Sequence, residues 1–161
     1  MPVTYDPIAT QTLTTATATV TFSSIPQTYT DLVLVAQMRL TNGTQPVMMR
    51  FNGDSGTNYS ITRIYGSGSS SPSDRYPNQD GIDCAYVSNS NWNIVNHSIQ
   101  SYSNTTTFKT MLGRWNDSAY TFAQVGLWRN TSAITTISLT PIAGDTHISG
   151  STFTLYGIKA A

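Results

Sequence analysis

The sequence contains no glutamate and only two lysines, Lys109 and Lys159, in 161 residues. Its acidic residues are all aspartates, and they balance the lysines and arginines to a formal net charge of zero. Proteins that bind nucleic acids concentrate basic residues in a stripe or cluster, because phosphate contacts dominate their affinity. The arginines of this chain are scattered singly, so we expect no nucleic-acid partner. A neutral surface favours association with other protein surfaces, because little charge repulsion keeps them apart.

Cysteine is equally scarce, and Cys84 alone cannot form an internal disulfide. The aliphatic residues around it predict a small buried side chain rather than a reactive thiol. The only histidines, His97 and His147, stand fifty residues apart without the further ligands that a zinc site needs. The sequence also lacks the G-x-S-x-G motif of serine hydrolases. We therefore predict no enzyme activity, no metal site and no cofactor.

Long apolar segments are missing as well. The sequence does not open with a positively charged stretch followed by an apolar one, so no secretory signal is expected. The longest apolar run, from Leu32 to Ala36, is far too short to cross a bilayer. We therefore expect no membrane partner.

Threonine, serine and asparagine are abundant, together with valine, isoleucine and tyrosine. This composition favours β-structure, because β-branched and aromatic residues fit a pleated, half-buried surface and serine and asparagine populate turns. Alternating and apolar runs predict about ten strands, at residues 15–22, 32–39, 47–51, 59–65, 82–87, 94–102, 106–115, 119–128, 134–139 and 152–158. No pattern predicts a helix of three turns. The predicted fold is all-β, an antiparallel two-sheet β-sandwich with jelly-roll-like connections.

Turn residues predict how some of these strands are joined. Asn42-Gly43 separates two apolar runs, so we expect strands 32–39 and 47–51 to pair as a hairpin. Asn116-Asp117-Ser118 predicts a second hairpin over residues 106–128. Residues 66–81 have no hydrophobic period and are predicted to form an exposed loop.

The first thirteen residues differ from the rest, which we predict to be a single β-sandwich domain over residues 14–161. Pro2, Tyr5, Pro7 and Ile8 are apolar or stiff residues without strand alternation. This pattern predicts an extended N-terminal arm, residues 1–13, that gains order by contacting another subunit or a larger assembly.

Residues 52–58, which read Asn-Gly-Asp-Ser-Gly-Thr-Asn, place side-chain oxygens at alternate positions, as calcium-binding loops do. Asparagine, aspartate and glycine are also the residues of a tight turn, and the chain has no glutamate to serve as a bidentate ligand. We therefore predict a hairpin or an Asx-turn that positions Asn58 and Tyr59, without a metal.

Aromatic residues near loops and strand ends are the remaining candidates for a binding site. Arg75, Tyr76 and Trp92 lie in the least regular segments, where rings can stack on sugar faces while polar groups bond hydroxyls. These three residues are the candidate glycan contacts. Core packing or a subunit interface explains the same rings equally well.

Several segments together resemble the small virion proteins of tailed bacteriophages. They are residues 50–60, the loop 66–70, Val125-Gly126-Leu127-Trp128-Arg129 and the C-terminal residues 150–159. The resemblance implies a particle-bound β-sandwich, commonly a homotrimer, located in the virion. It brings no catalytic residues with it.

Two roles follow from this resemblance. The first is a head decoration (cement) protein that binds the major capsid protein and stabilises the assembled capsid, with Pro2, Tyr5, Pro7 and Ile8 as the capsid or subunit contacts. The second is a tail or tail-fibre component that contacts other tail proteins and host surface glycan. The sequence shows no repetitive or coiled-coil shaft ahead of the predicted sandwich, so we expect the first role. A depolymerase enzyme is the third alternative.

Overall fold

A computed structural model describes residues 4–117 and 119–159. These residues contain no helix and therefore none long and apolar enough to cross a membrane. They form twelve β-strands: β1 (Tyr5–Thr12), β2 (Val20–Phe22), β3 (Asp31–Met38), β4 (Thr44–Phe51), β5 (Tyr59–Gly66), β6 (Ser73–Gln79), β7 (Ile82–Ser88), β8 (Asn93–Gln100), β9 (Lys109–Asn116), β10 (Thr121–Trp128), β11 (Ile137–Pro141) and β12 (Thr152–Ile158).

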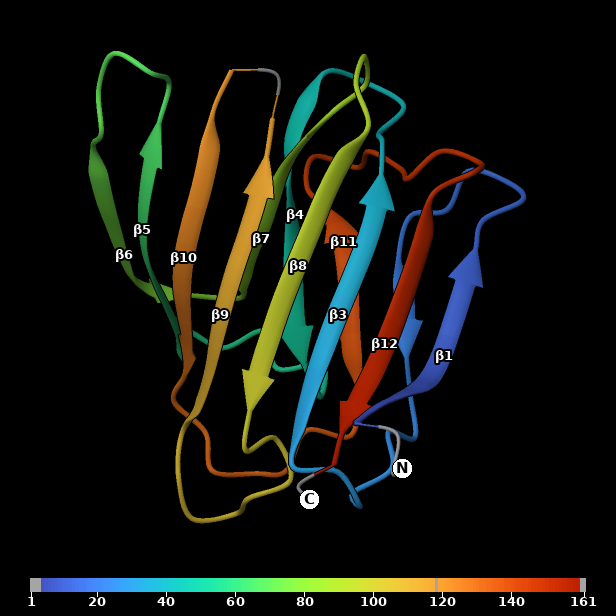
Figure 1. The fold of residues 1–161 in the computed structure, drawn as a ribbon, viewed down its shortest axis with the longest axis vertical. Helices are drawn as coiled ribbons and strands as arrows, with labels where there is room; N and C mark the ends of the chain where they lie inside the picture. Colours follow the sequence, from blue (N-terminus) through green and yellow to red (C-terminus); the bar gives the residue numbers. More distant parts are fainter. Residues whose placement is uncertain (1–3, 118, 160–161) are drawn as a thin grey trace.

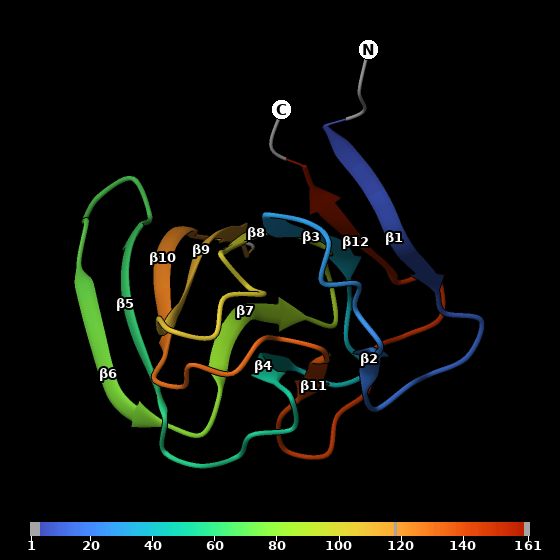
Figure 2. The ribbon, with the colours of Figure 1, turned by 90° about the horizontal axis from the view of Figure 1, so that it is seen from below.

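The strands make two antiparallel sheets that pack face to face (Figures 1 and 2). The large sheet has eight strands in the order β1-β12-β3-β8-β9-β10-β5-β6, and the small sheet has four in the order β2-β11-β4-β7. Seen from below, the large sheet curves so that β5 and β6 wrap around one side of the small sheet (Figure 2). The prediction of an all-β, antiparallel two-sheet β-sandwich is confirmed.

The pairing of the strands explains the jelly-roll-like connections. β1 pairs with β12, β2 with β11, β3 with β8 and β4 with β7. These pairs form one long antiparallel ribbon whose successive segments alternate between the two sheets, as in jelly rolls. The hairpins β5–β6 and β9–β10 are insertions into this ribbon, and both extend the large sheet beyond β8. The large sheet is therefore wider than the small one because of two hairpins.

The core lies between the sheets, and one cluster of aromatic rings lies where β4, β5 and β10 meet. Trp128 stacks on Tyr59 with ring centroids 6.2 Å apart and also contacts Phe51. The turn of residues 52–58 supports these rings, because Asp54 accepts hydrogen bonds from the Trp128 Nε1 at 2.8 Å and from the backbone N–H of Gly56. The predicted Asx-turn is thus confirmed.

This turn also fixes the electrostatics of its neighbours. Burial acts to raise the pKa of Asp54, but hydrogen bonds from Trp128 and Asn58 outweigh it and lower that pKa. Burial raises the pKa of Tyr59 to about 12. The Tyr59 hydroxyl donates to the carbonyl oxygen of Asp54 at 3.2 Å, so the neutral phenol is part of the packed turn.

The expected hairpin between strands 32–39 and 47–51 is wrong. β3 pairs with β12 and β8 in the large sheet, whereas β4 pairs with β11 and β7 in the small sheet. The turn at Asn42-Gly43 therefore crosses from one sheet to the other. Gly43 does adopt the positive φ of a tight turn, and the Asp145 carboxylate accepts the N–H of Asn42. The second predicted hairpin is confirmed by the β9–β10 pairing.

Three other segments differ from the sequence-based expectation. Of the predicted arm, residues 5–12 form β1, an edge strand paired with β12 of the same chain. Of the strand predicted at residues 15–22, only residues 20–22 form β2, and Ala16 and Ala18 are exposed. Of the loop predicted at residues 66–81, residues 73–79 form β6. Alternation is a weak signal in these segments because edge strands bury little.

Both edges of the large sheet carry a proline and an irregularity. Pro7 lies in β1, where the pairing with β12 shifts register between Pro7 and Ala9. Pro77 lies in β6, where the pairing with β5 shifts between Tyr59 and Ile61. Proline lacks the N–H that a ladder needs, so the open edge of a sheet tolerates it well.

Candidate functional site: the outer face of the large sheet

The outer face of the large sheet, turned away from the small sheet, exposes aliphatic side chains. Ile64 on β5, Ile94 on β8, Leu112 on β9 and Val125 on β10 are 61%, 58%, 56% and 48% exposed. Isolated exposed apolar residues are normal, but a contiguous group of them marks an interaction surface. Whether these four residues form an interaction surface therefore depends on whether they are neighbours in the sheet.

Strand pairing brings these residues together. Leu112 lies directly opposite Val125 across the β9–β10 pair, and Ile64 lies opposite Ala123 across β5–β10. Directly paired side chains on one face of a sheet are about 5 Å apart at Cβ. Residues Ile64, Ala123, Val125 and Leu112 thus form a continuous apolar surface over three strands.

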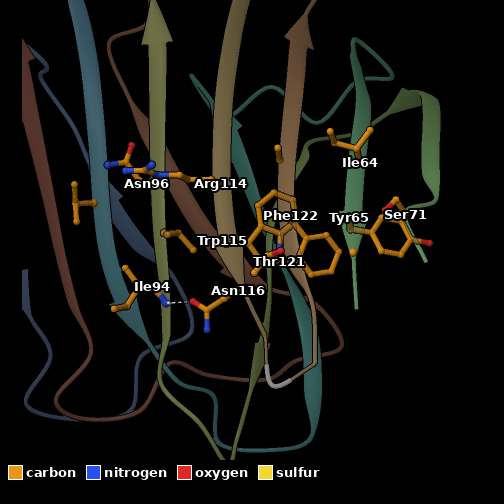
Figure 3. A pocket seen from close by; sticks show the side chains of 14 residues that line it. Ile64, Tyr65, Ser71, Ile94, Asn96, Arg114, Trp115, Asn116, Thr121 and Phe122 are labelled. Carbon is orange, nitrogen blue, oxygen red and sulfur yellow. Dashed lines mark hydrogen bonds between the residues drawn. The ribbon is translucent and has the colours of Figure 1, made fainter. Parts of the chain in front are cut away.

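A groove of about 690 Å³ begins at Ile64 and Ala123 and extends over β9 to β8 (Figure 3). Leu112 and Val125 are not among the residues that line it. Ile64, Tyr65 and Ser71 line the side formed by β5 and the loop that follows it, and Ile94 lies on β8. The volume falls in the usual range for ligand sites, roughly 300–1,000 Å³. The groove is open along the sheet, so it fits an extended ligand or a protruding segment better than an enclosed small molecule.

Polar groups meet at the centre of the groove. Arg114 is exposed and lies opposite Asn96 across the β8–β9 pair, and the two side chains reach toward each other in Figure 3. Asn116 follows two residues later on the same face, and its side-chain oxygen accepts the N–H of Ile94 at 3.3 Å. Within residues 4–117 and 119–159, no group accepts a hydrogen bond from the Arg114 guanidinium or from the side-chain amides of Asn96 and Asn116.

On the opposite, inner face, Arg63 of β5 is surrounded by acidic and aromatic side chains. Arg63 is 6% exposed and forms an ion pair with Asp74 at 3.2 Å. Its guanidinium donates to the Tyr76 hydroxyl at 2.9 Å and lies 4.8 Å from the Tyr76 ring centroid and 5.1 Å from that of Tyr86. This cluster holds β6 against β5 and β7. Burial is the largest cause that raises the pKa of Tyr76, so its hydroxyl stays neutral near pH 7.

The structure separates the three candidate glycan contacts. Arg75 is exposed on the outer face, opposite Thr62 of β5. Tyr76 points to the other face and packs on Arg63. Trp92 lies in the turn between β7 and β8, where Arg39 covers its ring at 5.2 Å from the centroid. The three residues therefore do not form one site.

The candidate arm contacts also take different positions. Tyr5 is exposed and packs edge-on against Tyr156 of β12, and Pro7 is exposed. Ile8 is half-buried against the core. Pro2 lies outside the described residues.

The titratable and nucleophilic residues considered from the sequence are buried in the sheets. Burial lowers the pKa of both His97 and His147 to about 4 and raises that of Cys84. Cys84 is thus the small buried side chain that its neighbours predicted. Among the described residues no three histidine, cysteine or aspartate side chains lie close enough together to hold a metal ion.

Sequence reasoning missed the residues of the groove. Arg114 is one of several scattered arginines, and which face each strand residue occupies depends on a register that the sequence does not show. A signal was nevertheless present, because β9 has apolar residues at adjacent positions, Met111 and Leu112. Apolar and polar residues should alternate along a strand that has one solvent-exposed face. Two adjacent apolar residues therefore indicate an apolar surface on each face of β9.

No protein-family model matches the chain, and no curated protein matches it. Solved structures with a similar arrangement include the galectin LEC-6 of Caenorhabditis elegans, with 10% identity, a TM-score of 0.39 and coverage of 94% of this chain and 96% of the galectin. The alginate lyase Aly36B gives 8% identity and a TM-score of 0.37 over 94% of this chain and 80% of the lyase. A protein of unknown function from Shewanella oneidensis, SO2946, gives 10% identity and a TM-score of 0.28 over 98% and 71%. Likenesses at this level carry no argument about what this chain binds.

Proposed function

We propose that the protein is a structural protein of a bacteriophage virion, a head decoration protein that binds and stabilises the assembled capsid without catalysis. The observation that supports this role is the contiguous aliphatic surface on the outer face of the large sheet. Folding leaves Ile64, Leu112 and Val125 about half exposed or more, so a protein partner is the natural cover for them.

The energetics fit such a role. Burying one valine, leucine or isoleucine side chain completely stabilises a protein by about 1.5–3 kcal/mol, so covering a half-exposed one adds roughly 1 kcal/mol. A partner that binds only the assembled capsid shifts the assembly equilibrium by mass action. The formal net charge of zero removes long-range repulsion between neighbouring copies.

The proposed partners are the major capsid protein and further copies of this chain. We expect a homotrimer, the state common among the virion proteins that the sequence resembles. Light scattering on the isolated protein measures this directly. A monomer at micromolar concentration would restrict association to the particle surface.

The proposed function is tested by adding the purified protein back to particles that lack it. We expect particles without the protein to assemble but to lose their genome at lower temperature, and the wild-type protein to restore heat resistance. Leu112→Asp places a charge in the aliphatic surface and should lower occupancy at least about tenfold, because an unpaired charge is costly at a covered interface. Thr21→Asp, an exposed change on the small sheet, is the matched control and should bind normally.

Two outcomes would contradict the proposal. The first is full occupancy by the Leu112→Asp protein. The second is unchanged heat resistance of particles that lack the protein.

A second function has its own supporting observation. The amide and guanidinium groups of Asn96, Asn116 and Arg114 converge in the groove and can bond hydroxyl groups, which suits a tail or tail-fibre protein that binds host surface carbohydrate. Under that function, loss of the protein would abolish adsorption to cells while leaving heat resistance of the head intact.

A further inference from the structure

We propose that the groove around Arg114 accepts an extended, acidic segment of the protein partner, with a carboxylate at Arg114 and aliphatic groups on either side. This inference rests on the proposed function, because the partner is the capsid surface that the large sheet covers.

The first argument is the pairing of charges within the chain. Three of the basic residues form ion pairs: Arg50 with Asp80, Arg63 with Asp74 and Lys159 with Asp6. Three other basic residues have contacts that do not involve a carboxylate. Lys109 and Arg129 donate to backbone carbonyl oxygens, and Arg39 lies over the ring of Trp92.

Arg75 and Arg114 remain, and neither has an acceptor or a carboxylate partner in the part of the chain that the structure describes. Both are exposed on the outer face of the large sheet. No aspartate lines the groove. A protein of zero net charge thus presents on this face two cations that have no acceptor among the described residues, and such a face favours an acidic partner.

The second argument is the geometry of the donors. Arg114 lies opposite Asn96, and Asn116 lies one side-chain repeat further along β9, about 7 Å away. A carboxylate can accept two parallel hydrogen bonds from a guanidinium and still accept from a neighbouring amide. Ile64 and Ala123 on one side and Ile94 on the other then contact the aliphatic residues that flank the acid.

Two other occupants fit less well. A second copy bound about a two-fold axis that passes through the groove would bring Arg114 near the partner's equivalent cation, which is repulsive. An acidic sugar could pair with Arg114, but sugar faces stack on exposed rings. Of the three rings that line the groove, Trp115 and Phe122 are 4% and 9% exposed, and only Tyr65, at the side of the groove, is half-buried.

Charge reversal at one position tests the inference. Arg114→Glu should weaken binding to particles that lack the protein at least about tenfold, because it places like charges together at a covered interface. Arg114→Gln should weaken binding less and should reduce its salt dependence. Arg75→Glu is the matched control, since it makes the same charge change on the same face outside the groove, and it should change affinity no more than about threefold.

The results separate this inference from the proposed function. Normal binding by Arg114→Glu together with loss of binding by Leu112→Asp would overturn the acidic segment and leave the docking face in place. Equal weakening by Arg114→Glu and Arg75→Glu would also overturn it, because only the general charge of the face would matter. Normal binding by all three variants would overturn both. Urea unfolding of each variant confirms that it is folded.

An oligogalacturonate of about six sugars serves as the probe for an acidic glycan. We expect no chemical-shift changes in the groove when it is added at about 1 mM, a concentration at which even weak glycan binding is detected. Binding of this probe to the wild type but not to Arg114→Glu, with unchanged binding of both to particles, would overturn the inference and identify an acidic glycan as the ligand.

Discussion

The two faces of the large sheet are built from the same strands and yet bury their apolar residues to very different degrees. The inner face is packed with rings such as Trp115 and Trp128, which are almost completely buried. The outer face carries aliphatic residues such as Ile64 and Leu112, which remain more than half exposed. Folding buries the rings of the inner face, whereas it leaves the aliphatic residues of the outer face exposed. The comparison therefore distinguishes residues selected for stability from residues available for binding.

The sharpest test of this comparison is a truncation on each face. Trp128→Ala removes the ring that stacks on Tyr59 and the donor to Asp54, and we expect a loss of about 3–5 kcal/mol in the free energy of unfolding. Leu112→Ala on the outer face should cost no more than about 0.5 kcal/mol. Urea titration followed by tryptophan fluorescence and circular dichroism measures both. Similar losses in the two variants would mean that the outer face also supports the fold.

Acidification should destabilise the protein through its two buried histidines. Burial holds the pKa of His97 and His147 near 4 in the folded chain, below the ordinary value of 6.5 in the unfolded chain. The stability they contribute is therefore complete above pH 6.5 and is lost as the pH falls toward 4, because the unfolded chain takes up protons first.

Between about pH 7.5 and about pH 4.5 each histidine should account for a loss of about 2–3 kcal/mol. Urea titrations at the two pH values measure the loss. A His147→Gln variant should show a distinctly smaller loss over the same interval than the wild type. The same pH dependence in both proteins would show that this histidine is not neutral and buried as described.

Gly113 tests how closely the inner face is packed. A Cβ added at this position would lie 2.2 Å from the Nδ1 of His97, so Gly113→Ala should cost about 1–3 kcal/mol. The double variant with His97→Ala should recover part of that cost, because the ring that causes the overlap is gone. Strictly additive losses in this double-mutant cycle would contradict the close approach.

The smallest expected effect on stability belongs to the outer face. Ile64→Thr and Val125→Thr replace exposed aliphatic residues with β-branched polar ones that suit a strand, so the free energy of unfolding should change by no more than about 0.5 kcal/mol. The same variants should bind less well to particles. Reduced stability with unchanged particle binding would reverse the roles assigned to the two faces.

The sequence predicted those features that depend on local residues. Alternation and turn residues were enough for the β9–β10 hairpin, and the composition of residues 52–58 was enough for the Asx-turn. The Asn42-Gly43 signal predicted a tight turn correctly but could not tell whether the strands it joins share a sheet, because that depends on pairing with distant strands. The hairpin of β3 with β4 was wrong for this reason.

The candidate site was harder to predict for the same physical reason. Arg114 becomes distinctive only when β8 places Asn96 beside it and when the other cations find partners elsewhere in the fold. Arg75 was identified from its irregular segment, and its neighbour Tyr76 proved to belong to the opposite face. A change of one position along a strand reverses the face, and no local pattern in β6 defines it.

The prolines at the two edges of the large sheet have a consequence for how copies of the protein behave when crowded. A strand-rich chain without net charge risks, at high local concentration, edge-to-edge pairing into continuous sheets, which is the route to fibrils. Pro7 and Pro77 each remove a ladder donor, and the register shift beside each interrupts the row of groups that an incoming strand would need. The two edges of the large sheet are therefore poor templates for a strand of another copy.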